Sequence, residues 1–85
     1  MTPVTIYTTA VCPFCIAAKR LFDNLGVEFS EVRLDRDPAL RMRLAEENDG
    51  WRTVPMIFVG DRFIGGFMEA RNLHKEGRLL PVIGE

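Results

Sequence analysis

The chain has 85 residues, with 11 basic against 12 acidic side chains and a formal net charge of −1. This length allows one small domain, residues 1–85, and excludes a second hydrophobic core. Hydrophobic residues make up 47% and charged residues 27%, so the chain can bury enough apolar surface to fold rather than stay disordered. The near-even charge argues against nucleic acid as the main partner, because phosphate binding needs an excess of Lys and Arg.

The apolar segments are too short to cross a membrane. The longest, residues 10–18, is interrupted by Pro13 and is far shorter than the roughly 20 residues that a helical span needs. The first residues, Met1-Thr2-Pro3, lack the basic start of a secretory signal, and no apolar segment of the required kind follows them. We therefore expect a protein of the cytoplasm without a membrane partner.

The first half of the chain predicts a β-α-β unit. Residues 4–8 alternate and are rich in residues that favour strands, which predicts a strand, and a loop follows over residues 9–11. The next segment, residues 13–25, places its apolar side chains at helical spacing and begins with Pro13, which suits the first helical position. Gly26 ends this helix, and residues 27–34 form a second, less regular strand.

The second half predicts a helix, a hairpin and a final helix. Asp37-Pro38 opens the helix, with Asp37 as its N-cap, and Asn48-Asp49-Gly50 ends it. The fully apolar residues 56–59 form a buried strand, which a Gly60-Asp61 turn connects to a strand at residues 62–64. A last helix is predicted from about residue 67 to residue 76. The order βαβαββα predicts an α/β fold: a four-stranded mixed sheet, with a parallel first pair and helices on both faces.

Two cysteines, Cys12 and Cys15, stand at the start of the first predicted helix with a C-x-x-C spacing. In a reducing compartment such a pair more often serves catalysis or metal binding than structure. Zinc needs four ligands, and His74 is the only histidine that could add a nitrogen ligand, so we expect no metal site. Redox chemistry is favoured over the alternative, a pair of small buried apolar side chains.

The helix start makes the two sulfurs unequal. Cys12 falls at the N-cap and Cys15 three residues later, which puts their α-carbons about 5–6 Å apart, within disulfide range. Free amide groups and the helix dipole favour a negative charge on Cys12 and lower the pKa of its thiol from about 8.5 into the range of roughly 3.5–7.5. Cys12 is the predicted nucleophile, and Cys15 is the more shielded, resolving cysteine of a redox-active disulfide.

Several segments together resemble a glutaredoxin of the dithiol kind. They cover nearly the whole chain: Ile6-Tyr7-Thr8, Cys12-Pro13-Phe14-Cys15, Thr53-Val54-Pro55, and Gly65-Gly66 before the last helix. The resemblance implies a thioredoxin-like fold and an oxidoreductase that uses glutathione to reduce protein–glutathione mixed disulfides and small disulfides. It further implies a monomer that takes glutathione as a co-substrate, holds no bound cofactor, and acts on glutathionylated or disulfide-containing proteins.

Similarity to this family also implies where glutathione binds. Pro55 would be a cis-proline facing Cys12, and the Val54 backbone would pair with the cysteinyl part of glutathione as a short strand. The helix that follows Gly66 offers free N–H groups to the γ-glutamyl carboxylate, and an acidic side chain there would meet the amino group. Without the resemblance, Thr53-Val54-Pro55 would be interpreted as a plain turn into a strand, and Gly65-Gly66 as a flexible turn into a helix. The expected glutathione-binding residues are Thr53, Val54, Pro55, Gly66, Phe67, Met68, Glu69 and Arg41.

The sequence departs from the family pattern at Thr9, where relatives commonly carry a Lys or Arg that holds the glycine carboxylate of glutathione. Arg41 is the expected substitute, with Arg43 and Arg52 as nearby candidates. Lys19 lies two helical turns from Cys12, about 10 Å along the axis, and cannot touch the sulfur. We therefore expect the helix terminus to stabilise the thiolate, and glutathione to bind more weakly than is usual for the family.

Two alternatives stay open at this point. One is a redoxin of the same fold that thioredoxin reductase reduces. The other is a module that holds an iron–sulfur cluster between two protomers, since thiolates such as Cys12 suit clusters, although relatives of that kind tend to have a small residue in place of Pro13. Oxidative disulfide formation is disfavoured by the missing export signal.

Two aromatic residues also depart from the pattern of dithiol glutaredoxins. Phe14 replaces the commoner tyrosine of the motif, and Trp51 resembles the monothiol branch or is an aromatic at the rim of the sheet.

Overall fold

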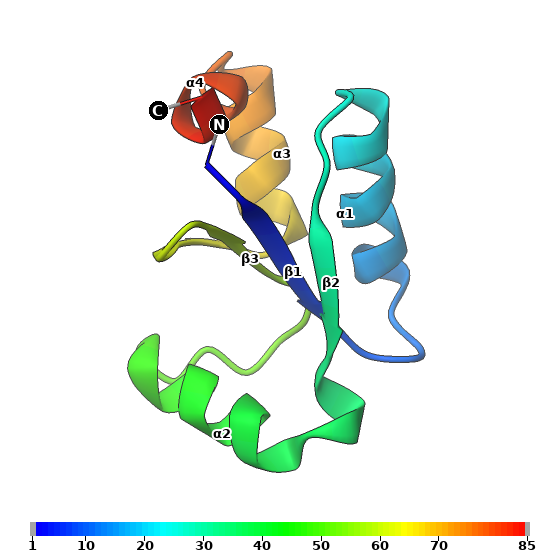
Figure 1. Ribbon diagram of the computed structural model, residues 1–85, viewed down its shortest axis with the longest axis vertical. Coiled ribbons are helices and arrows are strands. Elements are labelled where there is room, and N and C mark those ends of the chain that lie inside the picture. Colours follow the sequence, from blue (N-terminus) through cyan, green and yellow to red (C-terminus); the bar gives the residue numbers. More distant parts are fainter. Residues whose placement is uncertain (1, 85) are drawn as a thin grey trace.

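The computed structural model describes residues 2–84 and contains a four-stranded sheet between two layers of helices (Figure 1). The predicted order βαβαββα is confirmed, and the structure adds a 3-10 turn and a short final helix. In chain order the elements are β1 (Val4–Thr8), α1 (Pro13–Asn24), β2 (Ser30–Arg33), η1 (Leu34–Arg36), α2 (Pro38–Glu47), β3 (Met56–Val59), β4 (Arg62–Gly65), α3 (Phe67–Lys75) and α4 (Leu79–Gly84).

The strands lie in the order β2-β1-β3-β4, which places β1 and β3 in the centre of the sheet. β1 pairs with β2 in parallel, whereas β1 with β3 and β3 with β4 are antiparallel. Ile6 of β1 faces Ile57 of β3 across the ladder, and both side chains are fully buried. The mixed sheet with a parallel first pair and an antiparallel last pair is therefore as predicted.

Alternation along the central strands divides the core into two clusters. The larger cluster, on what we call the α1–α3 side of the sheet, unites Ile6 and Ile57 with buried residues of α1, α3 and α4, including Phe22. The smaller cluster, on the α2 side, is built on Leu34, Leu44 and Met56. Figure 1 shows α1 and α3 on one side of the sheet and α2 on the other. Helices thus cover both faces.

The second strand is shorter than predicted at both ends, with residues 30–33 in place of residues 27–34. The N–H of Val27 donates to the carbonyl of Phe22 at 3.0 Å, and Gly26 has a φ of +69°, so this segment closes α1 as a Schellman motif. Because that amide serves the helix end, the chain joins the sheet only at Ser30. Leu34 is buried in the 3-10 turn rather than in the strand.

Helix α4 is an element that the sequence analysis does not predict. Leu79 and Ile83 lie one helical turn apart, and both are buried against the α1–α3 side of the sheet. Their i, i+4 spacing was the available signal, but the segment has only six residues and contains Pro81. Pro81 falls in the first turn of α4, where a missing N–H leaves no intrahelical bond unmade.

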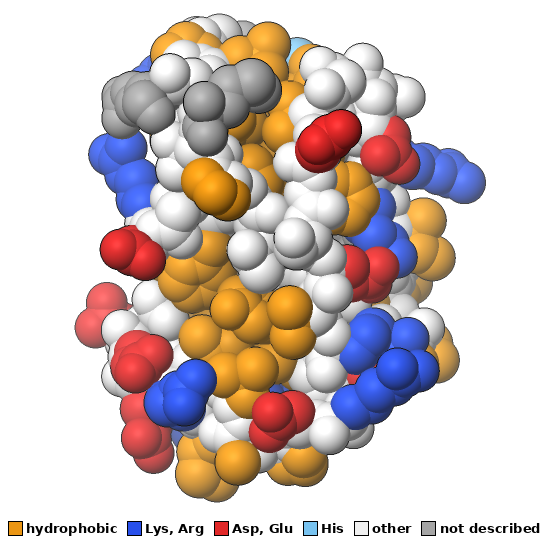
Figure 2. Space-filling view, viewed as in Figure 1, with side chains coloured by type: hydrophobic (Ala, Val, Ile, Leu, Met, Phe, Trp, Pro, Cys, Tyr) orange, Lys and Arg blue, Asp and Glu red, His pale blue; other side chains and the backbone are white. Residues whose placement is uncertain are grey.

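Charge is distributed without a dominant sign over the face seen in Figure 2, where apolar side chains reach the surface between α2 and the sheet. Lys and Arg side chains alternate there with Asp and Glu, in agreement with the net charge of −1. Within residues 2–84, none of the helices has the length and apolar character that a membrane crossing requires.

Candidate active site

The cysteine pair lies where the loop after β1 enters α1. Cys12 is the N-cap with extended backbone angles, Pro13 takes the first helical position, and the N–H of Cys15 donates to Cys12 Sγ at 3.0 Å. The two cysteines form a disulfide with their α-carbons 5.2 Å apart. The predicted cap position and the predicted spacing are therefore both found.

The environment of the two sulfurs differs as expected from the helix start. Cys12 is 8% exposed and Cys15 2% exposed, so Cys15 is the more shielded of the pair. The Cys15 amide that donates to Cys12 Sγ favours the anionic form of this sulfur after reduction, because hydrogen bonds to a charged acceptor are stronger than neutral ones. This arrangement supports Cys12 as the nucleophile.

Behind the disulfide, three polar side chains connect α1 to the sheet. The hydroxyl of the fully buried Thr8 donates to Glu31 at 2.6 Å, and Lys19 of α1 pairs with the same carboxylate at 3.1 Å. The hydrogen bond from Thr8, followed by the bond and charge of Lys19, lowers the pKa of Glu31 below its ordinary value. Lys19 is therefore bound to Glu31, and the network holds the first turns of α1 on β1 and β2.

The Val54–Pro55 peptide bond is cis, as the resemblance implied. The Val54 carbonyl oxygen lies 3.6 Å from Cys12 Sγ, although the two residues are 42 positions apart in the sequence. Pro55 is buried and β3 starts directly after it, whereas Thr53 is exposed. The loop before β3 thus faces the sulfur with its backbone.

A pocket of about 330 Å³, which we call the α3 pocket, is lined by Phe14 of the C-x-x-C motif and by Val54, whose carbonyl faces Cys12. Apart from Arg41, every residue expected to bind glutathione lines this pocket, together with Phe14 and Trp51. Phe14 and Phe67 stack with their ring centroids 6.2 Å apart, which connects the starts of α1 and α3 and makes an apolar wall. The expected glutathione-binding residues therefore converge, and their role in binding stays a prediction.

The start of α3 shows why two glycines stand there. Gly65 has a φ of +112°, and a Cβ on it would lie only 2.6 Å from Glu69 Cγ. The N–H of Gly66 donates to Glu69 Oε1 at 2.8 Å, so the Glu69 carboxylate caps the helix. This capping role was missed in the sequence analysis, although a glutamate at the third helical position was the signal for it.

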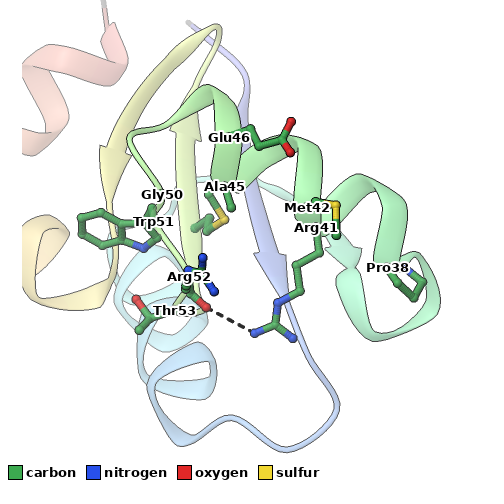
Figure 3. Close-up of a pocket in the computed structure, with 10 residues that line it drawn as sticks. Pro38, Arg41, Met42, Ala45, Glu46, Gly50, Trp51, Arg52 and Thr53 are labelled. Carbon is green, nitrogen blue, oxygen red and sulfur yellow. Dashed lines mark hydrogen bonds between the residues drawn. The ribbon is translucent and has the colours of Figure 1, made fainter.

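Arg41 lies outside the α3 pocket, in a neighbouring groove of about 570 Å³. This α2 groove is lined by residues of α2 and of the loop before β3, chiefly Arg41, Met42, Ala45, Trp51, Arg52 and Met56 (Figure 3). The Arg41 guanidinium reaches across the groove and donates to the Arg52 carbonyl at 3.3 Å. Of the other candidates, Arg52 lines the same groove, and Arg43 is exposed on α2 outside its lining.

Trp51 lies on the border that the two cavities share. Its indole packs edge-on against Phe63 of β4 with centroids 5.1 Å apart, which agrees with an aromatic at the rim of the sheet. Trp51 and Thr53 line both the α3 pocket and the α2 groove. Within residues 2–84, no group of three or more His, Cys, Asp or Glu side chains is placed to hold a metal ion.

Disulfide exchange is the chemistry that this geometry allows, because a nearly buried sulfur at a helix start can form and break a bond with its neighbour without rebuilding the fold. The cysteine pair at the helix start, the mixed sheet and the cis-proline loop together define a thiol–disulfide oxidoreductase of the thioredoxin-like class. Residues 4–64 match the glutaredoxin family. The chain therefore belongs to the glutaredoxin family.

Individual relatives support this assignment. A glutaredoxin of Pseudomonas aeruginosa is 46% identical over 79 residues, which cover 93% of both chains. Among solved structures, a buckwheat glutaredoxin–glutathione complex is 31% identical with a TM-score of 0.91, over 98% of this chain and 77% of that one. A glutaredoxin of Brucella melitensis is 37% identical with a TM-score of 0.87, over 100% of this chain and 94% of that one.

Proposed function

We propose that this oxidoreductase depends on glutathione and reduces protein–glutathione mixed disulfides and small disulfides in the cytoplasm. The single observation that carries the proposal is that Val54, whose carbonyl lies 3.6 Å from Cys12 Sγ, also lines the α3 pocket. The similarity to a glutaredoxin whose structure was solved as a glutathione complex supports it. Glutathione acts as a co-substrate and not as a bound cofactor.

In the first step, the Cys12 thiolate attacks the glutathione sulfur of a mixed disulfide. The new bond joins Cys12 to glutathione, the old S–S bond breaks, and the substrate sulfur leaves as a thiolate that takes up a proton. A second glutathione thiolate then attacks the glutathione sulfur held on Cys12, which yields oxidised glutathione and restores the Cys12 thiolate. Alternatively, Cys15 displaces glutathione, which produces the intramolecular disulfide present in the structure.

The α3 pocket supplies the binding contacts that this route needs. Glutathione's cysteinyl part pairs with the Val54 backbone, and its γ-glutamyl carboxylate lies at the free amide groups of Phe67 and Met68. Arg41 takes the glycine carboxylate from the edge of the adjoining α2 groove. The pocket volume of about 330 Å³ lies within the range of small-molecule sites.

Thr9 distinguishes this chain from relatives with a cation at that position. Because Thr9 carries no charge, the Cys12 thiolate depends on the amide groups of its own helix, and glutathione binds more weakly than in those relatives. We expect the Thr9→Lys variant to bind glutathione more tightly and to have a lower Cys12 pKa, measured by the pH dependence of alkylation. A variant unchanged in both respects would contradict this account.

The test is a deglutathionylation assay coupled to glutathione and glutathione reductase. Cys12→Ser is expected to lose activity by at least about a thousandfold, as when a nucleophile is removed from an enzyme. Cys15→Ser is expected to retain activity through the route that uses a second glutathione. Activity retained in Cys12→Ser would contradict the proposal. Failure of the wild type with glutathione, together with reduction by thioredoxin reductase, would select the redoxin alternative.

A further inference from the structure

We propose that the α2 groove binds the polypeptide that flanks a target cysteine, and that it prefers a segment with an apolar side chain next to an acidic one. This inference rests on the proposed function and extends it from glutathione to the protein substrate. It concerns disulfides in which a peptide, rather than glutathione, becomes attached to Cys12.

The groove is continuous with the site of the chemistry. Thr53 lines both the α2 groove and the α3 pocket, and it directly precedes Val54, whose carbonyl lies 3.6 Å from Cys12 Sγ. An extended peptide advances about 3.3–3.6 Å per residue. A peptide attached to Cys12 and paired with the Val54 backbone therefore reaches the groove within a few residues.

The floor and one wall of the groove are apolar. Met42 of α2 is 66% exposed, and it stands beside the half-buried Ala45 and the buried Met56 at the start of β3. α2 uses Leu44 to pack on the sheet, so Met42 is not part of that contact. The flexible, polarizable side chain of Met42 can adapt to the different side chains that a peptide places in the groove.

Positive charge also lines the groove. Arg41 and Arg52 both face the groove, and neither guanidinium has a carboxylate partner among residues 2–84. Arg41 uses part of its hydrogen-bonding capacity on the Arg52 carbonyl, which holds it across the groove. Glu46 also lines the groove, but its carboxylate points away from Arg41 (Figure 3). Guanidinium groups bind carboxylates with two parallel hydrogen bonds, so an acidic side chain complements this wall. Arg41 holds the glycine carboxylate when glutathione is attached to Cys12, and it is available to the peptide when a peptide is attached instead.

The kinetic test compares three substrates in the glutathione-coupled assay. Two are disulfide-linked dimers of a short peptide, identical except that Leu-Glu or Leu-Lys flanks the cysteine, and the third is hydroxyethyl disulfide. We expect the wild type to have a KM for the Leu-Glu dimer about tenfold below that for the Leu-Lys dimer, which corresponds to about 1.4 kcal/mol. Equal KM values for the two dimers would overturn the proposal.

A matched pair of variants tests whether the preference for the Leu-Glu dimer arises in the α2 groove. Met42→Glu places a negative charge in the groove and, at saturating glutathione, is expected to raise the KM for the Leu-Glu dimer about tenfold, while the rate with hydroxyethyl disulfide stays within about twofold. Ala39→Glu adds the same charge on the exposed surface of α2 outside the groove lining. It is expected to leave the kinetics with all three substrates unchanged. If Met42→Glu impaired the reduction of hydroxyethyl disulfide to the same extent at saturating glutathione, the substitution would not act on the peptide and the proposal would fail.

Binding can also be measured without turnover. Trp51 is the only tryptophan in the chain and lines the groove, so its fluorescence reports occupancy. Peptides with Ser in place of Cys are titrated, and the Leu-Glu peptide is expected to bind about tenfold more tightly than the Leu-Lys peptide. If the Leu-Glu peptide binds more tightly but the protein does not use glutathione, the proposed function is refuted and the peptide-binding proposal is not. If the two peptides bind equally to an enzyme that is active with glutathione, the peptide-binding proposal is refuted and the proposed function is not.

Discussion

The two sides of the sheet differ in what holds their functional groups. On the α1–α3 side, a large core that includes the fully buried Phe22 supports the helix from which Cys12 and Cys15 project, both nearly buried. On the α2 side, the core is small, and α2 presents Met42 to solvent. The chemistry therefore depends on backbone amides and carbonyls that packing fixes, whereas the surface next to it consists of side chains that can change without disturbing the sulfur.

The largest expected effect is a loss of stability when a core side chain is truncated, and this loss should differ between the two clusters. Phe22→Ala empties a fully buried site in the larger cluster and is expected to lower the free energy of unfolding by about 3–5 kcal/mol. Leu44→Ala, in the smaller cluster at 6% exposure, is expected to cost about 2 kcal/mol, at the low end for such a truncation. Urea unfolding of both variants measures the difference. Equal losses would show that the α2 side is as tightly packed as the other.

A glycine pair tests how the α3 pocket is held. Gly65→Ala introduces a Cβ only 2.6 Å from Glu69 Cγ at a φ of +112°, so we expect a loss of about 2–3 kcal/mol and a higher KM for glutathione substrates. Gly77→Ala also has a positive φ, +71°, but its Cβ meets open space, and about 1 kcal/mol is expected without a change in KM. Unfolding and steady-state kinetics measure both, and similar results for the two would contradict the role of close contact at Gly65.

Substitutions of Glu69 separate its structural role from its charge. Glu69→Ala removes the acceptor for the Gly66 N–H and is expected to cost about 1 kcal/mol of stability. Glu69→Gln keeps an acceptor oxygen but no charge, so stability should be nearly retained while the KM for glutathione substrates rises. Thermal unfolding and kinetics on the two variants give the comparison. An unchanged KM in Glu69→Gln would leave Glu69 as a helix cap alone.

The smallest expected effect is the pH dependence of the network behind the disulfide. The hydrogen bond from Thr8 lowers the pKa of Glu31 in the folded protein below the usual value of 4.5. The unfolded state then binds more protons in this range, so the contribution to stability is present above pH 4.5 and is lost as the pH falls through the folded pKa. We expect Glu31→Gln to lose less stability than the wild type between pH 6 and pH 3, measured by urea unfolding. An identical pH profile would contradict this assignment.

Local interactions account for the part of the site that could be predicted. Cys12 as N-cap, Pro13 at the first helical position and Cys15 one turn later all follow from residues within four positions of each other. The strands of the sheet and their pairing directions likewise follow from short-range patterns and short connections. The short second strand was mispredicted because the Val27 side chain is apolar enough for a strand, while its amide is needed to close α1.

The sequence by itself determined the order of the four strands and of α1, α2 and α3, because these follow from short-range patterns. It also determined the position of the cysteine pair at a helix start and the inequality of its two sulfurs, because these depend on backbone groups next to the pair. Only the tertiary structure decided how Val54 meets Cys12 across 42 positions, and that α2 and the loop before β3 enclose a groove beside the site. Such contacts depend on how the two layers of helices pack on the sheet, and no local pattern of residues encodes that packing.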